Sequence, residues 1–593
     1  MTTCYPSLNA LWTDLIVEEL VRCGVSHFFM TPGSRSSPLV VAAARNKRVH
    51  SLIHFDERGA AYCALGYSRA AGSPAAVICT SGTAVANLVS AVVEASMDTV
   101  PLILLTADRP PELRATGANQ TIDQVKFFGD YVRWCCDLPC PDRNILAASV
   151  LTTVDQAVYQ ARRAPAGPVH LNCMFREPLA PVGSDQDFSE YLAQLSRRRT
   201  GQAPFTQYPA PAAVAQSDTT EETAALLREA RKPLLIVGRM RNKTQANAVR
   251  SLGKSLGLLV CADVASGLRL GVDHDITVPF YDLLLLSERF AEHFRPDMIL
   301  HIGGVPTSKR LLHFLEHLRD AEYVMVADHP LRHDPVHRVR YRIECDVVQF
   351  CERLVDNAVG FKSDQTWIQS ILSYSTTVEK VLKDHIDKSN ELTEPAVARI
   401  VSQKIESYTG LFLAGSMPIR DMDMYADPCG PTVMVGCNRG ASGIDGTIAS
   451  AAGFALGLGR PVTLLIGDLA FLHDLNSLNL LQTLRHPLTI ILINNNGGGV
   501  FSMLPISDVK DVFERCFGTP HGLTFENAAA LFGLNYHQPK SRTQFESVFS
   551  TAQKGAKSTL IEVRTDREEN VRIHRDLEQR IIDAIEAECA CDL

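Results

Sequence analysis

Two residues in the last third of the chain, Asp468 and Asn495, could together hold a divalent cation. Asp468 follows an apolar run at 462–467, and Asn495 follows another at 488–493. Two such runs joined by a helix, which we expect over 469–485, are typical of a βαβ unit with parallel strands. A right-handed crossover brings the C-terminal ends of both strands to one edge of the sheet. Carboxylate and amide oxygens suit Mg²⁺, which leaves its other positions to phosphate oxygens and water. This edge is therefore predicted to be a Mg²⁺–diphosphate site.

The spacing of these residues strengthens the prediction, although each part of the pattern is common. Gly-Asp pairs end many strands, and asparagine-rich turns usually only make turns. Here Asn495 lies twenty-seven positions after Asp468, and Gly497 offers a backbone carbonyl two positions later. This order resembles the Mg²⁺ motif of the thiamine-diphosphate (ThDP) enzymes. Leu469 stands where that superfamily more often has a second glycine, a departure that leaves the ligands unchanged.

A second group of candidate residues lies in the first third of the chain. Glu57 opens an expected helix and is followed by a small, apolar face. A carboxylate in the first turn of a helix also complements the helix dipole, so Glu57 alone decides little. Ser81-Gly82-Thr83 and the segment 31–36 lie at strand-to-helix turns, where free backbone N–H groups bind anions.

Composition and charge exclude some classes of protein. The 593 residues predict several domains, and the net charge, 58 − 66 = −8, argues against a general nucleic-acid binder. Residues 2–23 are expected to form an amphipathic helix and not a signal peptide. The apolar stretch 75–95 contains Asn87 and Glu94 and is expected to be a buried strand and helix, not a membrane span.

The 16 cysteines are scattered and show no metal-ligand CxxC pairing. Reduced thiols in the cytoplasm are therefore expected, and we interpret the local cluster Cys135, Cys136 and Cys140 as structural.

The chain is expected to contain three α/β domains. Strand–turn–helix units recur over 1–185, and 186–220 has the composition of a linker. A second α/β domain is expected over 221–355, and a polar, helical linker over 356–390. The third α/β domain is expected over 391–593 and ends in a surface helix at 575–589.

Nine segments, in order, resemble one family of ThDP enzymes. They are TPGSRSSPL (31–39), HFDERGAAYCALG (54–66), TSGTAVANL (80–88), LLTADRPPEL (104–113), GANQTID (117–123), GSMPIR (415–420), NRGASGIDG (438–446), GDLAFLHDLN (467–476) and NNNGGGVFSMLP (494–505). They resemble the 2-succinyl-5-enolpyruvyl-6-hydroxy-3-cyclohexene-1-carboxylate (SEPHCHC) synthases, the MenD family. The match is dense over 25–185 and 410–510, thin in the middle, and nearly absent from the last 60 residues.

The resemblance implies three doubly wound parallel-sheet domains: pyrimidine-binding (1–185), central (221–355) and diphosphate- and Mg²⁺-binding (391–593). It implies a ThDP-dependent carboligase, or transferase, of menaquinone or phylloquinone biosynthesis. This enzyme would decarboxylate 2-oxoglutarate and add the succinyl carbanion to isochorismate, releasing CO₂. A cytoplasmic homo-oligomer is implied, with active sites between chains, no nucleic-acid partner and no membrane span. Dimer and tetramer both stay open.

The resemblance also implies roles for the cofactor residues. Glu57 would hydrogen-bond the aminopyrimidine ring of ThDP and promote loss of the thiazolium C2 proton. Desolvation in an apolar pocket would favour its protonated form. Ile444 matches the bulky residue that wedges the cofactor. The other matched positions are Ser81, Gly82 and Thr83 for the cofactor, and Asp468, Asn495 and the Gly497 carbonyl for Mg²⁺ or Mn²⁺.

Both implied substrates are dicarboxylates, which arginine binds efficiently through paired hydrogen bonds. We expect Arg420 and Arg439 to bind 2-oxoglutarate, although this division of the cations between substrates stays open. The cations expected at isochorismate are Arg35, Arg109, Lys309 and Arg310. Ser34, Asn119, Gln120 and Ser416 are expected as polar partners of these cations as a whole, without a division between the two substrates. Glu57, Ser34, Arg35 and Gln120 are the expected catalytic residues. Phe501 and Leu504 would form an apolar wall that keeps water from the carbanion.

Three alternatives remain open at this point. A 2-oxoacid decarboxylase or acetolactate-synthase-like enzyme would keep the cofactor, but a monocarboxylate acceptor would not need so many arginines. A non-catalytic scaffold with the ThDP fold has no need of Glu57, Asp468 and Asn495 together. A Rossmann NAD enzyme is disfavoured because no GxGxxG motif opens a helix here.

Overall fold

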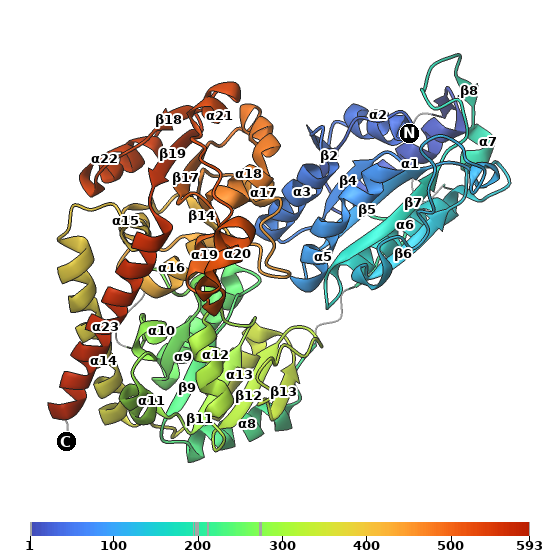
Figure 1. Cartoon of the computed structure of the whole chain (residues 1–593). Helices are drawn as coiled ribbons and strands as arrows, with labels where there is room; N and C mark the ends of the chain where they lie inside the picture. Colours follow the sequence, from blue (N-terminus) through green and yellow to red (C-terminus); the bar gives the residue numbers. More distant parts are fainter. Residues whose placement is uncertain (1–2, 194, 196–200, 210–212, 272–275, 592–593) are drawn as a thin grey trace. The chain divides into compact units, whose positions relative to one another are not determined.

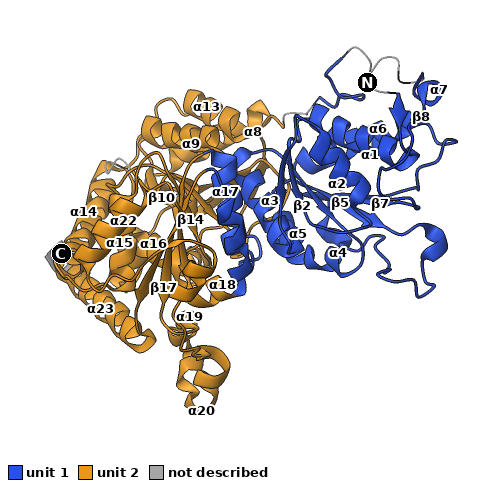
Figure 2. Cartoon of the chain, turned by 90° about the horizontal axis from the view of Figure 1, so that it is seen from above, with its two compact units in different colours: residues 1–211, 438–459, 473–485 blue, residues 212–437, 460–472, 486–593 orange. Residues whose placement is uncertain are grey.

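The chain divides into two compact units. The computed structural model describes all residues except 1–2, 194, 196–200, 210–212, 272–275 and 592–593. The first unit comprises residues 1–211, 438–459 and 473–485, and the second comprises 212–437, 460–472 and 486–593 (Figure 2).

The first unit is built on a six-stranded parallel sheet. In spatial order its strands are β3 (His50–Ile53), β2 (His27–Met30), β4 (Ala75–Cys79), β5 (Leu102–Asp108), β7 (Pro168–Met174) and β6 (Trp134–Leu138). Strands β4, β5 and β7 are buried along their whole length, as expected for a parallel sheet covered on both faces. The helices of this domain are α1 (Leu8–Arg22), α2 (Ser37–Arg45), α3 (Glu57–Ala71), α4 (Thr83–Asn87), α5 (Val89–Met97) and α6 (Ala147–Arg162).

The second unit contains a five-stranded parallel sheet in the middle of the chain. Its order is β10 (Leu259–Ala262), β9 (Pro233–Val237), β11 (Met298–Ile302), β12 (Glu322–Ala327) and β13 (Tyr341–Glu344). Figure 1 labels β9, β11, β12 and β13 of this sheet. The associated helices are α8 (Ser217–Glu229), α9 (Lys243–Leu256), α10 (Tyr281–Leu284), α11 (Glu288–Phe294), α12 (Lys309–His317) and α13 (Val347–Asn357).

A second six-stranded parallel sheet follows in the same unit. Its order is β15 (Met434–Cys437), β14 (Gly410–Leu413), β16 (Val462–Gly467), β17 (Leu488–Asn494), β19 (Thr559–Arg564) and β18 (Asn535–His537). The helices of this region are α14 (Gln365–Leu382), α15 (Glu394–Lys404), α16 (Met417–Tyr425), α18 (Asp468–His473), α19 (Gly499–Ser502), α20 (Lys510–Phe513), α21 (Glu526–Leu531), α22 (Arg542–Ala552) and α23 (Arg567–Cys591).

The three parallel sheets share one topology, which determines where ligands can bind. In each sheet the first strand has the second on one side and the third on the other, so the strand order reverses between the first and third strands. Ligands of open α/β sheets bind outside the C-terminal ends of the strands at this switch point. In the first sheet the switch point lies between β2 and β4, and in the last sheet it lies between β14 and β16. The predicted α/β fold class, with three doubly wound parallel sheets, is confirmed.

Helix α17 (Thr447–Leu458) belongs to the first unit although its neighbours in sequence lie in the second (Figure 2). It packs closely on α3 because glycines line the contact. A Cβ on Gly66 would lie 1.9 Å from the Ser450 carbonyl oxygen, and one on Gly453 would lie 1.8 Å from the Cys63 carbonyl oxygen. The backbones of the two helices therefore touch, which larger residues would prevent.

Two expectations about helices are corrected. The helix predicted over 469–485 is α18 followed by a 3₁₀ segment, Leu475–Gln482. The chain leaves α geometry at Asp474, whose buried carboxylate accepts the Ala449 N–H and the Ser477 hydroxyl. The linker predicted over 356–390 was expected to be helical, and it contains α14, which packs into the unit through Trp367, among other buried residues. Its assignment as a linker remains a prediction.

The expected surface helix at 575–589 begins earlier, as α23, and buries Leu577, Ile581 and Ile585. Domain boundaries remain predictions, and α8 already begins inside the expected linker 186–220. In the part of the chain that the structure describes, no helix has the length and hydropathy that a membrane span requires.

Candidate active site

The predicted cation ligands meet at one edge of the last sheet. Strands β16 and β17 are parallel neighbours, with Gly467 opposite Ile493. The Gly497 N–H donates to Asp468 Oδ2 over 2.9 Å, so the turn after β17 closes onto the residue after β16. Gly497 has φ of +135°, a conformation that essentially only glycine adopts. The prediction that Asp468 and this turn lie together is confirmed.

Asn495 presents an oxygen that the protein leaves unsatisfied. Its side chain is 8% exposed, and no hydrogen-bond donor reaches Oδ1 among the residues that the structure describes. Other buried polar atoms among the described residues also lack a partner, so this oxygen points to an ion only together with the Asp468 carboxylate at the same sheet edge. A carboxylate, this amide oxygen and a nearby carbonyl form the donor set that Mg²⁺ prefers, so the residues present fit the cation.

Asp468 is oriented by three donors. Leu469 N–H donates to Oδ1 over 2.7 Å, while Gly497 N–H and His521 Nε2 contact Oδ2. The Leu523 N–H donates to His521 Nδ1, which leaves Nε2 as the protonated nitrogen that donates to Asp468 over 3.1 Å. Sequence reasoning missed His521, because it lies 53 residues from Asp468 and carries no local motif.

Two further buried acids lie near these ligands. Glu394 Oε1 accepts Asn495 Nδ2 over 3.0 Å, and burial, together with the charge of Asp468, raises the pKa of Glu394. Burial, and then the charge of Glu394, raises the pKa of Asp421. A bound cation would reduce the cost of placing these carboxylates together. Neither acid was identified from the sequence.

Glu57 lies at the start of α3, in the first unit. Asp56 caps this helix by accepting the Arg58 N–H over 2.9 Å, and Glu57 follows as the first helical residue. Its carboxylate is half-buried and accepts Asn87 Nδ2 from α4 over 3.0 Å. The role of Glu57 toward the cofactor, and its enclosure by apolar groups, remain predictions.

The turns at the switch point of the first sheet gather several predicted residues. Arg109 donates to Ser81 Oγ, and Gln120 Nε2 donates to the Ser81 carbonyl over 2.9 Å. Gly82, with φ of +80°, donates its N–H to Gln124 Oε1. Gln124 was not predicted as a site residue, and it stabilises the turn by accepting this hydrogen bond. The neighbouring Thr83 is exposed, as are Ser34 and Asn119.

Two arginines of this region lie buried near each other. Arg35 is 8% exposed and Arg109 is 9% exposed. Burial, followed by the charge of Arg35, lowers the pKa of Arg109. Arg35 Nη1 donates to the Phe175 carbonyl, and its Nε is without a partner among the residues described. Adjacent buried guanidinium groups suit an anion such as a substrate carboxylate.

The predicted cations of the second unit differ in their surroundings. Arg420 Nη1 donates to the Ser416 carbonyl over 2.5 Å, and Ser416 has φ of +67°. Arg310 forms ion pairs with Asp282 and Glu578, so its guanidinium already has protein partners. Lys309 is exposed at the start of α12. A substrate contact by Arg310 remains a prediction. Its ion pair with Glu578 links α12 to α23.

The apolar candidates are accessible. Ile444 is 36% exposed and Leu504 is 43% exposed, while Phe501 is half-buried and packs edge-on against Phe517. Ile444 is therefore not an ordinary core isoleucine, and its contact with the cofactor remains a prediction. Arg439, just after β15, is half-buried.

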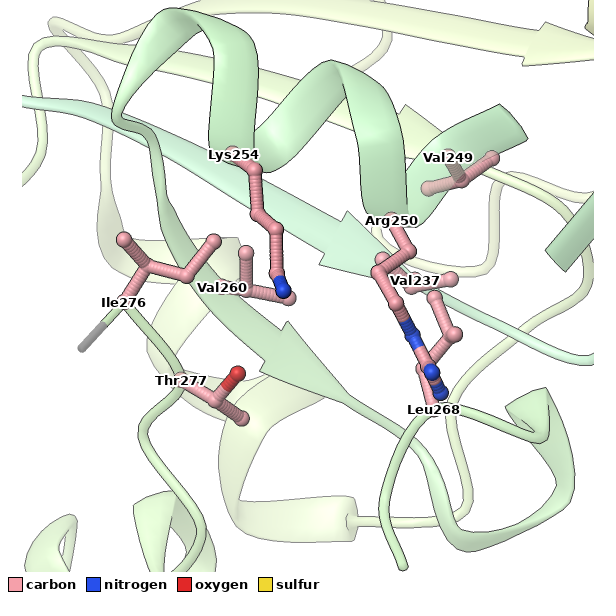
Figure 3. Close-up of a pocket in the computed structure, with 8 residues that line it drawn as sticks. All are labelled: Val237, Val249, Arg250, Lys254, Val260, Leu268, Ile276 and Thr277. Atoms are coloured by element: carbon pink, nitrogen blue, oxygen red, sulfur yellow. The ribbon is translucent and has the colours of Figure 1, made fainter. Parts of the chain in front are cut away.

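A separate pocket lies in the central domain, between α9 and strands β9 and β10. Figure 3 shows Arg250 and Lys254 of α9 beside its apolar walls. Its lining residues are Val237, Val249, Arg250, Lys254, Val260, Leu268, Ile276 and Thr277. None of them was predicted to bind cofactor or substrate, and the pocket is distinct from the cation site.

Comparison with known proteins defines the class to which this fold and site belong. Family models match the N-terminal TPP binding domain of thiamine pyrophosphate enzymes over residues 12–127, the middle domain over 189–413 and the C-terminal TPP binding domain over 423–563. A solved structure of a putative thiamin diphosphate-dependent enzyme from Mycobacterium smegmatis has the same fold. Its TM-score is 0.70 at 17% identity, over 94% of this chain and 99% of that chain. The chain is thus a member of the thiamine-diphosphate enzymes.

Curated relatives narrow the assignment to one family. The protein of Rubrobacter xylanophilus is 48% identical over 96% of this chain and 98% of its own length. That of Salinibacter ruber is 47% identical over 98% of both chains, and that of Prosthecochloris aestuarii is 44% identical over 99% of this chain and its own full length. All three are named 2-succinyl-5-enolpyruvyl-6-hydroxy-3-cyclohexene-1-carboxylate synthase. The chain belongs to the SEPHCHC synthase family.

Proposed function

We propose that the chain catalyses the SEPHCHC synthase reaction with 2-oxoglutarate and isochorismate as substrates. The observation that carries the proposal is the end-to-end similarity to the synthases, at 48% identity over 96% of the chain. The buried pair Arg35 and Arg109 supports it, because dicarboxylate substrates need such cations. The product belongs to menaquinone or phylloquinone biosynthesis.

The proposed cofactors are ThDP and a divalent cation, Mg²⁺ or Mn²⁺. Asp468, Asn495 Oδ1 and the Gly497 carbonyl would hold the cation against the cofactor diphosphate. Bound ThDP would supply the carbanion chemistry. The donor set and the unsatisfied Asn495 oxygen support this site.

The protein's own groups would bind, orient and shield. Glu57 would hold a proton at the pyrimidine nitrogen, and Asn87 fixes its carboxylate. Ile444 would press on the cofactor, with Ser81, Gly82 and Thr83 beside it. Phe501 and Leu504 would exclude water from the reacting carbon.

The substrate positions are proposed as two sets. Arg420 and Arg439, with Ser416, would bind the carboxylates of 2-oxoglutarate. The set proposed for isochorismate is Ser34, Arg35, Arg109, Asn119, Gln120, Lys309 and Arg310. Because the family's sites lie between chains, we further propose a cytoplasmic homo-oligomer in which Glu57 comes from one chain and the cation ligands from another.

The test incubates purified protein with ThDP, Mg²⁺, isochorismate and one oxoacid at a time, and identifies adducts by mass spectrometry. A succinyl adduct of isochorismate formed from 2-oxoglutarate, and absent with pyruvate, is the expected result. Acetolactate from pyruvate would contradict the proposal and favour the alternative carboligase. Glu57→Gln should abolish the adduct while ThDP still binds, whereas full activity of this variant would remove Glu57 from proton transfer.

A further inference from the structure

Glu394 is a buried carboxylate with two neutral partners. It is the first residue of α15, is 3% exposed, and has no ion pair with any basic group that the structure describes. Its Oε1 accepts Asn495 Nδ2 over 3.0 Å and Thr565 Oγ1 over 2.9 Å. A carboxylate in a first helical turn also complements the helix dipole, but that role requires neither burial nor these bonds. Burying a carboxylate without a basic partner is costly, so the burial of Glu394 needs a further explanation.

The bond from Asn495 to Glu394 determines which end of the amide faces the cation site. Glu394 Oε1 accepts hydrogen bonds from Asn495 Nδ2 and Thr565 Oγ1, so the NH₂ group of Asn495 is turned toward Glu394. Oδ1 then points away from Glu394, and it is the atom left without a donor among the described residues. The opposite orientation would present NH₂ hydrogens to a cation and remove a ligand.

The contact also ties together three segments at the sheet edge. Asn495 follows β17, and Thr565 follows β19 and donates its N–H to the Asn494 carbonyl over 3.0 Å. Glu394 joins both from the start of α15, which Thr393 caps by accepting the Ala396 N–H. The Glu394 carboxylate is therefore held at the start of α15 and cannot move together with the Asn495 side chain.

We propose that Glu394 is a positioning residue of the cation site, whose carboxylate holds the Asn495 amide with Oδ1 toward the metal ion. The inference rests on the proposed function in one respect, namely that Asn495 is a ligand. Partners of this kind behind metal ligands change metal affinity by about 10- to 100-fold when removed.

The test measures ThDP-dependent binding of Mn²⁺ to the full chain by electron paramagnetic resonance, in which free aquated Mn²⁺ gives the signal. Glu394→Ala should weaken Mn²⁺ binding by about 10- to 100-fold. Glu394→Gln should stay close to the unsubstituted protein, because its amide oxygen still accepts Asn495 Nδ2.

Glu562 offers a matched control. It is fully buried in the same domain and accepts Nδ2 of the adjacent Asn494 over 2.7 Å, but Asn494 is not a proposed ligand. Glu562→Ala should leave Mn²⁺ affinity unchanged. Equal losses in Glu394→Ala and Glu562→Ala would overturn the proposal, since they would reflect general destabilisation. Unchanged affinity in Glu394→Ala would also overturn it.

A second pair of substitutions tests the proposal even if Glu394→Ala does not fold. It exchanges the hydrogen-bond donor at position 495 with the acceptor at position 394. Asn495→Asp places two carboxylates together and should lose Mn²⁺ affinity. Adding Glu394→Gln supplies an NH₂ donor to that carboxylate and should restore affinity at least in part. Failure of this rescue would overturn the proposal. ThDP-dependent binding absent from the unsubstituted protein would instead contradict the cation site of the proposed function.

Discussion

Gly497→Ala is predicted to disable the proposed cation site without removing any of its proposed ligand atoms. The substitution keeps the Gly497 carbonyl, so a loss of binding would arise from geometry. A Cβ at this position would lie 1.9 Å from the Gly518 carbonyl oxygen, where ordinary contacts begin near 3.4 Å. The φ of +135° is in addition a conformation that L side chains rarely adopt.

The structure allows the free-energy cost of Gly497→Ala to be bounded. Backbone strain of this kind costs about 1–3 kcal/mol, and overpacking costs about 1–3 kcal/mol more. Relief requires the turn to separate from Gly518, which breaks the bond from Gly498 N–H to the Gly518 carbonyl. The bond from Gly497 N–H to Asp468 would be lost with it. If the variant needs about 2–4 kcal/mol more than the unsubstituted protein to adopt the turn that binds the cation, its cation affinity drops by about 30- to 1,000-fold.

The assay is isothermal titration of Mg²⁺ into protein with ThDP, together with the thermal shift that both ligands produce. Gly459→Ala is the matched control. Gly459 also has positive φ, +62°, but a Cβ added there would meet no atom of the described residues within 4 Å. The control should lose about 1 kcal/mol of stability and bind normally. Normal Mg²⁺ affinity in Gly497→Ala would refute the reasoning about this turn.

Three further predictions concern other parts of the chain. Gly453→Ala should lower the free energy of unfolding by about 1–3 kcal/mol, measured by urea titration, because its Cβ would meet the α3 backbone; an unchanged midpoint would contradict the close packing of α17. Burial raises the pKa of Asp474 to about 6, so its contribution to stability is present below about pH 4 and is lost as pH rises through about 6. The stability of the unsubstituted protein relative to Asp474→Asn should therefore fall by about 2 kcal/mol between pH 4 and pH 7, and a constant difference would refute the shift. Arg439→Ala should raise the KM for 2-oxoglutarate about tenfold or more, whereas an unchanged KM would exclude Arg439 from that pocket.

The sequence was sufficient to predict the parts of the fold that depend on local pattern. Short apolar runs ending in glycine or polar residues became parallel strands, and β16 and β17 brought Asp468 to the turn that contains Gly497. Three doubly wound sheets require strands and helices that alternate along the chain. This alternation can be read from local sequence, which explains why the fold class could be predicted.

The parts that were missed depend on contacts between distant residues. Glu394 lies 101 positions before Asn495, and His521 lies 53 positions after Asp468. Nothing in either local sequence distinguishes these residues from ordinary helix-start or loop residues. The break at Asp474 also has a tertiary cause, since its carboxylate turns inward to the Ala449 N–H of α17.

The most direct test of the central claim is the rate of CO₂ release from 2-oxoglutarate with ThDP and Mg²⁺, measured with and without isochorismate. Fast release is expected only when isochorismate is present, with one CO₂ formed for each isochorismate consumed. Release at the same rate without isochorismate would indicate a decarboxylase or another acceptor. No release in either case, from protein that has bound ThDP, would contradict the assignment of 2-oxoglutarate as the donor substrate.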